Sequence, residues 1–363
     1  MALKTSFQVV LFLFLLFNLF SQSCSSVDEL EFDKWISWNV NSFQMRQSNL
    51  ETEIREGLEK KLKKAEMNKV RINVSQDGTG DFKTIGGALH SIPLHKTRRT
   101  ILQIKPGVYR EKIAVPSSLP FVTFLGDSSN PPTILWNDTA TSAGKTFSSA
   151  TVAINASYFV AINMKFVNDA PYEIGSVGGQ AVALRTSGNK SAFYNCSFYG
   201  NQDTLYDHKG FHYFNNCFIQ GSVDFIFGYG RSLYENCQLN STAKNVSFVT
   251  AQKRTMSSLS SGFSFKDSQL TGSGRVYLGR AWGDYSRVVF SYTYMQNIVL
   301  PGGWDDWGDP DRDSRVYYGE YKCSGPGANL SERVRWARAL TDQEAMPFIG
   351  THYIDGHKWL LPT

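Results

Sequence analysis

Two pairs of polar side chains recur along the chain at nearly the same spacing. Gln180 and Gln202 are 22 residues apart, and Asp203 and Asp224 are 21 residues apart. If one turn of a repeating fold takes about 21 residues, each pair lies on consecutive turns and shares one face. Two carboxylates about 5 Å apart disfavour each other's charge. One is then expected to be protonated while its partner stays anionic, which provides an acid together with a base or a nucleophile.

Other residues in the same register suit the same chemistry. The two stacked glutamines would supply NH₂ donors for an oxyanion. Arg280, in the run Leu278–Trp282, could hold one aspartate in its charged form and fix its rotamer. Each residue alone also has a structural explanation: Asp203, for example, lies in a turn-rich string where aspartate often caps the backbone. Asp224 begins an apolar run, where burial of a carboxylate without a function is costly.

Aromatic side chains are frequent in the same segments. They are Tyr206, Phe227, Trp282, Trp304 and Trp307. Sugar rings stack on aromatic faces, so a groove with these residues suits a polysaccharide. The alternative is that the aromatic rings only cap the turns of the fold.

A repeat along the chain predicts the fold that positions these side chains. From Val70 onward, short β-rich runs are separated by Gly, Asn, Asp and Ser, and long amphipathic helices are absent. This pattern is compatible with three all-β folds: a sandwich, a propeller or a parallel β-helix. Tetrapeptides of the form Asn-x-x-apolar recur at intervals of 32, 21 and 20 residues, at Asn163, Asn195, Asn216 and Asn236. Unless these matches arise by chance, a period near 21 with longer insertions predicts an all-β, right-handed parallel β-helix with coils about 4.8 Å apart.

The first residues predict export. Lys4 precedes an apolar run from Phe7 to Phe20, and small polar residues follow it. This pattern is typical of a secretory signal peptide, here residues 1–25, and is too short to cross a bilayer; a membrane anchor is the alternative reading. No later segment has the roughly 20 apolar residues of a membrane-spanning helix.

Residues 26–69 and 70–363 differ in composition. The first segment is charged, with Glu- and Lys-rich helical character between Leu50 and Met67, and predicts an N-terminal arm that contains a helix with a solvated face. The second segment carries every chemical motif described above and predicts the catalytic β-helix domain.

Eight Asn-x-Ser/Thr triplets support export, since they are acceptors for N-glycosylation in secreted proteins. They begin at Asn73, Asn137, Asn155, Asn189, Asn195, Asn240, Asn245 and Asn329. Several are expected to be unused because they lie in predicted strands. A net charge of +5 and a pI near 8.8 favour an anionic surrounding. Nucleic acid is a poor candidate, because the chain has no nucleic-acid-binding motif and is predicted to be exported.

Five cysteines are too few for a disulfide scaffold and lack the spacing of a zinc site. Cys24 is expected to leave with the signal peptide or to lie beside it. The others are Cys196, Cys217, Cys237 and Cys323.

Taken together, five motifs resemble those of the plant pectin methylesterases (pectinesterases, carbohydrate esterase family 8) and follow the family's order. They are Gly107–Glu111 (GVYRE), Gln180–Leu184 (QAVAL), Gly200–Tyr206 (GNQDTLY), Asp224–Gly228 (DFIFG) and Leu278–Trp282 (LGRAW). Val74–Phe82 (VSQDGTGDF) also resembles the start of the family's catalytic domain. The resemblance covers the chain from about Val70 to its C-terminus.

The resemblance implies a solenoid of the pectin-lyase type and a carboxylic ester hydrolase that removes methyl esters from homogalacturonan. By position in the motifs, Asp224 would be the nucleophile and Asp203 the general acid and then base. Gln180 and Gln202 would be the oxyanion donors, and Arg280 the partner of Asp224. No metal or cofactor is implied.

The resemblance also implies sugar subsites. Trp282, with Phe227 and Tyr206, would line them, and Trp304 would be a further subsite residue. The implied setting is the plant cell wall, with pectin as the polymer partner, a proteinaceous inhibitor as a second partner, and a monomeric enzyme.

The sequence departs from the family's pattern at several positions. Asn201 stands where an aromatic is usual, Ala281 where proline is common, and Gly303 and Asp305 alter the spacing around the tryptophans. These departures bear on subsite preference and on the pattern of de-esterification. The cysteines at 196, 217 and 237 lack their usual partners, so they could pair with one another or stay free. The long N-terminal inhibitor-like region of many relatives has no counterpart before Val70.

Three other functions stay open at this stage. A retaining glycosidase also uses two carboxylates about 5 Å apart, although the glutamine pair and Arg280 speak against it. A pectate lyase shares this architecture but would be expected to have an acidic Ca²⁺ site, which the sequence does not suggest. An inactive wall-binding homologue would not need the complete set of two Gln, two Asp and one Arg.

Overall fold

A computed structural model describes residues 58–171 and 177–361 of the chain. The predicted signal peptide, with Cys24, and most of the predicted N-terminal arm lie outside the described residues. The described part of that arm contains the helix α2 (Lys60–Met67). Within the described ranges, no helix has the length and apolar character needed to span a membrane.

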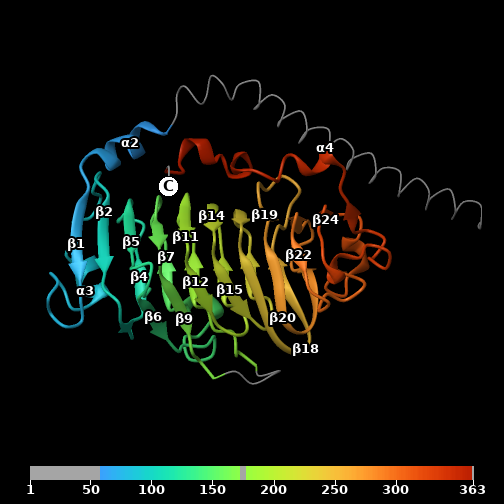
Figure 1. The fold of residues 1–363 in the computed structure, drawn as a ribbon, viewed down its shortest axis with the longest axis horizontal. Coiled ribbons are helices and arrows are strands. Elements are labelled where there is room, and N and C mark those ends of the chain that lie inside the picture. The colour runs from blue at the N-terminus through green and yellow to red at the C-terminus, as the bar shows by residue number, and fades with distance from the viewer. Residues whose placement is uncertain (1–57, 172–176, 362–363) are drawn as a thin grey trace, which may run out of the picture. The chain divides into compact units, whose positions relative to one another are not determined.

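Each coil of the chain adds parallel strands to three long faces (Figure 1), and every strand pairing among the described residues is parallel. Face A is one sheet of 11 strands. In spatial order it consists of β1 (Val70–Val74), β2 (Thr100–Ile104), β5 (Val122–Leu125), β8 (Val160–Ile162), β11 (Ser191–Tyr194), β14 (Phe211–Asn215), β17 (Arg231–Glu235), β19 (Gly262–Lys266), β21 (Arg287–Ser291), β24 (Tyr317–Tyr321) and β25 (Arg338–Ala339).

Faces B and C are joined because two long strands, β18 (Gln238–Gln252) and β20 (Gln269–Ala281), run across both. The other strands of face B are β3 (Val108–Tyr109), β6 (Thr133–Trp136), β9 (Lys165–Asn168), β12 (Ser197–Tyr199), β15 (Phe218–Gly221) and β22 (Tyr294–Met295). Those of face C are β4 (Ile113–Val115), β7 (Val152–Ile154), β10 (Leu184–Thr186), β13 (Leu205–Asp207), β16 (Ile226–Gly228) and β23 (Trp304–Asp305). This arrangement confirms the predicted parallel β-helix.

Helical segments are short and lie between or beside the coils. They are α3 (Ile85–His90), α4 (Asp342–Ala345) and the 3₁₀ turns η1 (Thr146–Ser148), η2 (Pro310–Arg312), η3 (Pro326–Ala328), η4 (Thr351–Ile354) and η5 (Gly356–Lys358). The C-terminal ones lie along face A, where the Ser264 hydroxyl donates to the Phe348 carbonyl and Tyr317 stacks on the Phe348 ring.

The asparagine repeat marks the turn from face A to face B. Asn163, Asn195, Asn216 and Asn236 all have left-handed backbones, with φ between 52° and 56°. Asparagine tolerates this conformation better than most residues do, which explains its recurrence at this point of each coil. Asn195 Nδ2 also donates to Asn163 Oδ1 at 2.7 Å, as expected for stacked asparagines. In later coils Asp267, Tyr292 and Lys322 occupy the same turn with φ of 48° to 52°, so the sequence repeat fades although the geometry continues.

The cysteines that follow these asparagines point into the core. Cys196, Cys217 and Cys237 are at most 1% exposed, and all three are free thiols, as is Cys323. In this structure they act as small apolar core residues, one per coil.

A ladder of aromatic rings in the core links five consecutive strands of face A. Each ring stacks on the next, with centroids 4.4 to 4.8 Å apart. The ladder runs through Phe193, Phe214, Tyr234, Phe265 and Phe290. Because each ring meets its equivalent one coil away, the ladder favours one register of the coils over slipped alternatives.

Truncation of a ring inside the ladder should therefore cost stability. We expect Phe214→Ala to lower the free energy of unfolding by about 3 to 5 kcal/mol, because it leaves a cavity and removes the stacking on Phe193 and Tyr234. Phe218→Ala, on the neighbouring strand β15 and only half-buried, should cost clearly less. Urea unfolding of both variants measures the difference, and equal losses would contradict the role of the ladder.

Candidate active site

A row of side chains points outward from face C and forms the floor of the candidate site. Backbone pairing aligns Tyr206 with Phe227, Phe227 with Ala251, and Ala251 with Arg280. The residues before them on β13 and β16 point into the core and are fully buried. Since side chains alternate along a strand, the aligned row must face outward.

The two aspartates lie at the start of this floor, just before β13 and β16. A parallel bridge pairs Gln202 with Val223, which places Asp203 opposite Asp224 on adjacent coils. The Asp203 amide donates to the Val223 carbonyl at 3.0 Å, as this pairing requires. Neighbouring strands lie about 4.8 Å apart, so the two aspartates are stacked. Both have left-handed backbones, with φ of 65° and 47°.

The glutamines stack in the same way. The Ala181 amide donates to the Gln202 carbonyl at 3.1 Å, and this bond sets Gln180 against Gln202 on the adjacent coil. Both glutamines line a cleft of about 460 Å³ together with both aspartates. The structure therefore brings together the residues that were predicted from spacing. The cleft is also lined by Tyr206, Phe227, Arg280, Trp282, Trp307, Lys145, Thr146, Phe147, Ala251 and Lys253.

Arg280 forms a salt bridge with Asp224 but not with Asp203. Its Nε donates to Asp224 Oδ1 at 2.9 Å, and its Nη2 donates to Asp224 Oδ2. The guanidinium carbon also lies 4.3 Å from the ring centroid of Phe248 and 3.9 Å from that of Trp307. The bidentate contact and the two rings fix both the position of Arg280 and the rotamer of Asp224.

Burial and charge separate the protonation states of the two aspartates. Asp203 and Asp224 are only 8% and 5% exposed. Burial, together with the negative charge of Asp224, raises the pKa of Asp203 well above its ordinary value, and Arg280 opposes this only in part. Burial also raises the pKa of Asp224, but there the hydrogen bonds and charge of Arg280 act directly against it. Asp203 is therefore the protonated member of the pair and Asp224 the anionic one.

A buried polar network supports β13 from inside the coil. Asp207, fully buried at the end of this strand, contacts His212 Nδ1 at 2.5 Å and accepts a hydrogen bond from the Tyr234 hydroxyl at 2.7 Å. His212 Nε2 lies 3.0 Å from the Gly188 carbonyl. The network ties face C, directly beneath Tyr206, to two strands of face A. Buried networks whose polar groups are hydrogen-bonded make the backbone around a site rigid.

Three of the four predicted subsite aromatics line the cleft. Tyr206 and Phe227 stack with centroids 4.2 Å apart, and Trp282 is tilted against Phe227 at 6.1 Å. Together they form an apolar platform beside the aspartates.

The prediction for Trp304 as a subsite residue is not supported by its position. Trp304 is 1% exposed, stacks on Tyr318 at 4.4 Å, and donates from Nε1 to Glu320 Oε1 at 3.2 Å. Because it is paired with Gly279 in face C, its ring fills space above a residue without a side chain. Of Trp304 and Trp307, the one that lines the cleft is Trp307, which is 39% exposed.

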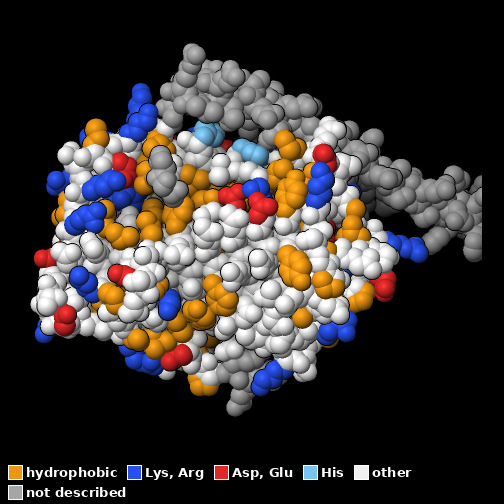
Figure 2. Space-filling model, in the orientation of Figure 1, with side chains coloured by type: hydrophobic (Ala, Val, Ile, Leu, Met, Phe, Trp, Pro, Cys, Tyr) orange, Lys and Arg blue, Asp and Glu red, His pale blue; other side chains and the backbone are white. Residues whose placement is uncertain are grey.

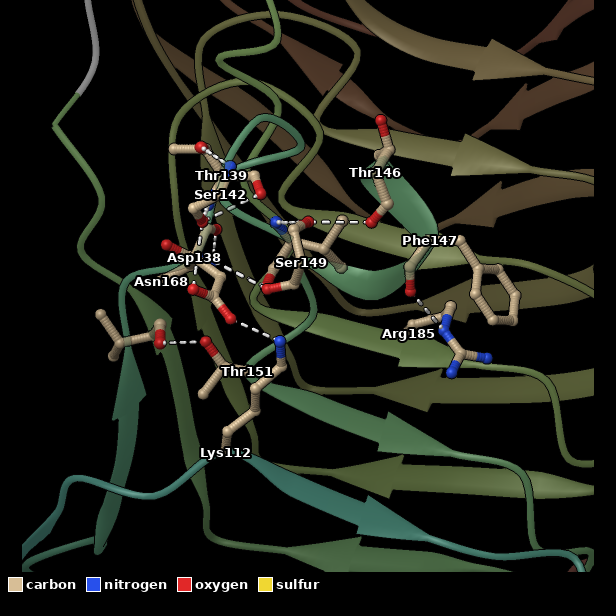
Figure 3. A network of polar contacts seen from close by, with 12 residues as sticks. Lys112, Asp138, Thr139, Ser142, Thr146, Phe147, Ser149, Thr151, Asn168 and Arg185 are labelled. Carbon is tan, nitrogen blue, oxygen red and sulfur yellow. Dashed lines mark hydrogen bonds and ion pairs between the residues drawn. The ribbon is translucent and has the colours of Figure 1, made fainter. Parts of the chain in front are cut away.

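One wall of the cleft comes from the loop between β6 and β7, which the sequence did not single out. Figure 3 shows the polar contacts that hold this loop, including Asn168 Nδ2 to the Asp138 carbonyl at 2.9 Å and the ion pair of Lys112 with Asp138. The loop presents Phe147, whose ring lies 6.2 Å from that of Tyr206. The Arg185 guanidinium covers the Phe147 ring at 3.6 Å and its Nε donates to the Phe147 carbonyl. No spacing rule connects residue 147 to the repeat, so only the folded chain reveals its position.

No group of three or more His, Cys, Asp and Glu side chains arranged to hold a metal ion is found in the described ranges.

Comparisons with known proteins agree with this geometry. A family model described as Pectinesterase matches residues 71–357. The Arabidopsis thaliana proteins "Probable pectinesterase 8" and "Putative pectinesterase 14" are 44% and 46% identical over 296 and 292 residues, which cover 79% and 80% of this chain and 75% and 88% of theirs. The solved "Pectin methylesterase from Carrot" is 35% identical with a TM-score of 0.75, over 80% of this chain and 96% of that one. "Pectin methylesterase PemA from Erwinia chrysanthemi" is 27% identical with a TM-score of 0.69, over 80% and 98%.

The buried acid predicts a specific pH dependence of stability. A carboxyl whose pKa is raised on folding stabilises the folded state fully at low pH, and this contribution is lost as pH rises through the folded-state pKa. Asp203→Asn removes that loss. We expect the variant to be more stable than the parent protein at pH 8, with a smaller difference at pH 4. Urea midpoints at both pH values measure the effect, and a variant less stable at pH 8 would contradict it.

Proposed function

Because this chain belongs to the pectinesterase family and hydrolyses the methyl esters of pectin, we propose that Asp224 is the nucleophile of this reaction and Asp203 its general acid and base. The observation that supports the assignment is the unequal environment of two stacked carboxyl groups. One is held by the bidentate contact with Arg280, and the other is buried without a cation against it.

The acylation step follows from these protonation states. The Asp224 carboxylate attacks the carbonyl carbon of a galacturonate methyl ester and forms a new carbon–oxygen bond. As the ester bond to the methoxy oxygen breaks, Asp203 gives its proton to that oxygen, and methanol leaves. Arg280 keeps the Asp224 carboxylate ionised and fixes its rotamer, so that one carboxylate oxygen faces the ester carbon.

Deacylation reverses the role of the acid. Asp203, now ionised, accepts a proton from a water molecule that attacks the acyl carbon. The bond to Asp224 breaks, which releases galacturonate and regenerates the Asp224 carboxylate and protonated Asp203. Methyl ester and water are thus converted to methanol and a free acid, which ionises in solution.

The glutamine pair suits the negative charge that develops on the carbonyl oxygen. Gln180 and Gln202 line the cleft on adjacent coils, beside the position that the ester must occupy. Two amide donors fixed before reaction stabilise the oxyanion without reorganisation.

The aromatic platform accounts for binding of the polymer. Methyl-esterified homogalacturonan would lie along face C, with Tyr206, Phe227, Trp282 and Trp307 against its sugar rings. We also propose residues 70–363 as the catalytic domain, 26–69 as an arm and 1–25 as a signal peptide that directs the chain to the cell wall. Exposed positions of Asn137, Asn189, Asn195, Asn245 and Asn329 support N-glycosylation there. A monomer and a proteinaceous inhibitor are further proposals.

Replacement of either aspartate should abolish activity without unfolding the protein. On highly esterified pectin, we expect Asp224→Asn and Asp203→Asn to lower the rate of methanol release by about 10³-fold or more. Asp267→Asn is a matched control, because it places asparagine in the turn that earlier coils fill with asparagine. The control should retain full activity.

The same assay distinguishes the other reactions that this architecture could perform. Reducing ends and unsaturated products are measured beside methanol. Methanol alone is expected. Chain cleavage without methanol would overturn the proposed chemistry.

Loss of one oxyanion donor should affect the chemical step more than binding. We expect Gln202→Ala and Gln180→Ala each to lower kcat by about 10²-fold, with a smaller change in KM. Steady-state kinetics of methanol release check this split. A rise in KM with kcat unchanged would instead assign the glutamines to substrate binding.

A further inference from the structure

A third aspartate lies close to the catalytic pair and has no part in the reaction described above. In the pairing of β23 with β20, Asp305 is the neighbour of Arg280. Paired residues of adjacent parallel strands point to the same side of a sheet, so Asp305 continues the outward row of face C by one more coil. The row therefore ends in a carboxyl group directly beyond the arginine that holds Asp224.

The segment that carries Asp305 is acidic, although the protein as a whole is not. The chain has a net charge of +5, and acidic side chains lie in small, separate groups on the face shown in Figure 2. Residues 305–313 nevertheless contain five aspartates, namely Asp305, Asp306, Asp309, Asp311 and Asp313. Arg312, in the same segment, pairs with Asp309 and Asp284. Among the described residues no ion pair involves Asp305, so no direct contact with a cation neutralises its charge.

Two local contacts fix the position of the Asp305 carboxylate. Its Oδ1 accepts a hydrogen bond from the Trp307 amide at 2.9 Å. A bond from the amide two residues further on is a common way for aspartate to fix a turn, and in this turn Trp307 has a left-handed backbone with φ of 67°. The guanidinium carbon of Arg280 lies 3.9 Å from the centroid of the Trp307 ring. Asp305 thus holds both its own charge and an aromatic ring beside Arg280.

The charged and titratable groups around Asp224 come from several elements. They are Asp203 before β13, Arg280 on β20, Lys253 after β18, Lys145 on the loop between β6 and β7, Asp305 on β23, and Tyr318 beneath them on β24. Burial raises the pKa of the Tyr318 hydroxyl, so this group stays uncharged. Burial also raises the pKa of Asp224, the hydrogen bonds and charge of Arg280 lower it, and the negative charge of Asp305 raises it again.

We propose that Asp305 is a positioning residue for the reaction, which offsets part of the positive charge of Arg280 and so keeps the Asp224 carboxylate a strong nucleophile. The inference rests on the proposed function, because it takes Asp224 as the nucleophile. As the pKa of a nucleophile falls, its nucleophilicity falls too. An arginine that stabilises a carboxylate very strongly would therefore slow its attack. A second carboxylate beyond the arginine limits this loss without any contact with the substrate.

The charge of Asp305 has opposite consequences at low and at higher pH. Because it disfavours the anionic form of Asp224, this carboxyl group loses its proton at a higher pH than it would with Arg280 alone. The enzyme is then less active in an acidic medium. Once Asp224 is ionised, it attacks the ester faster. Asp305 accordingly lowers activity at low pH and raises it at higher pH.

The test is the pH profile of kcat/KM for methanol release from fully methyl-esterified homogalacturonan, measured as initial rates so that the substrate has no carboxylates of its own to titrate. Asp305→Asn keeps an oxygen acceptor for the Trp307 amide and removes the charge. We expect the acid limb of its profile to lie about half to one pH unit below that of the parent protein. On the plateau, kcat should fall about two- to threefold.

The neighbouring aspartate provides a matched control. Asp306 accepts a hydrogen bond from the Gly308 amide at 2.7 Å in the same kind of turn, but it lies beyond the end of β23 and is not paired with β20. Asp306→Asn makes the same change of net charge and should leave the acid limb close to that of the parent. Asp305→Glu should also keep the limb in place, whereas Asp305→Gln should displace it. This second pair makes the test independent of the folding of one variant.

The outcomes separate this inference from the proposed function. If Asp305→Asn is slower at every pH and its acid limb has not moved, the inference is wrong, because the loss is then structural, and the assignment of Asp224 stands. Equal displacement of the limb in Asp305→Asn and Asp306→Asn would also overturn it, since net charge would explain both. If the parent protein releases no methanol at any pH, the proposed function fails and this inference fails with it.

Discussion

The register of the stacked coils is the constraint on which the rest of the structure depends. One backbone hydrogen bond, from the Asp203 amide to the Val223 carbonyl, fixes which residues of adjacent coils lie opposite each other at the site. A slip by one residue would turn one aspartate toward the other side of the strand and separate the pair. The aromatic ladder on face A and the Asp207–His212–Tyr234 network hold the same coils from inside.

Given this register, electrostatics assigns the chemical roles. Two carboxyl groups of the same residue type, at equivalent positions of adjacent coils, differ because a single arginine contacts only one of them. The solenoid makes such asymmetry easy to build, since each coil contributes the same backbone position with a different side chain. Arg280 reaches Asp224 from two coils further on, in the outward row of face C. Along that row the side chains change from the aromatic rings of Tyr206 and Phe227 to the guanidinium of Arg280, so the stacking surface and the catalytic groups are neighbours in the cleft.

Sequence spacing could predict the site wherever the residues belong to regular coils. The intervals of the Gln and Asp pairs match one turn of the solenoid, and their stacking followed from the period alone. Residues on insertions could not be placed in this way. Phe147 and Lys145 lie on a loop whose course depends on contacts such as that of Asn168 with the Asp138 carbonyl. Trp304 and Trp307 are three residues apart, and only the packing of Trp304 against Tyr318 and Glu320 shows which one is core.

The sequence by itself determined the coil period, the fold class and the set of side chains that share one face, because these depend on local backbone repetition. The tertiary structure decided which aspartate is held by Arg280, which of Trp304 and Trp307 lines the cleft, and how Phe147 comes to lie beside Tyr206. Those outcomes depend on burial and on contacts between segments that are distant in the chain. Spacing does not encode burial or long-range contacts. A residue type that lines the cleft at one strand position packs in the core at the next position, because side chains alternate along a strand.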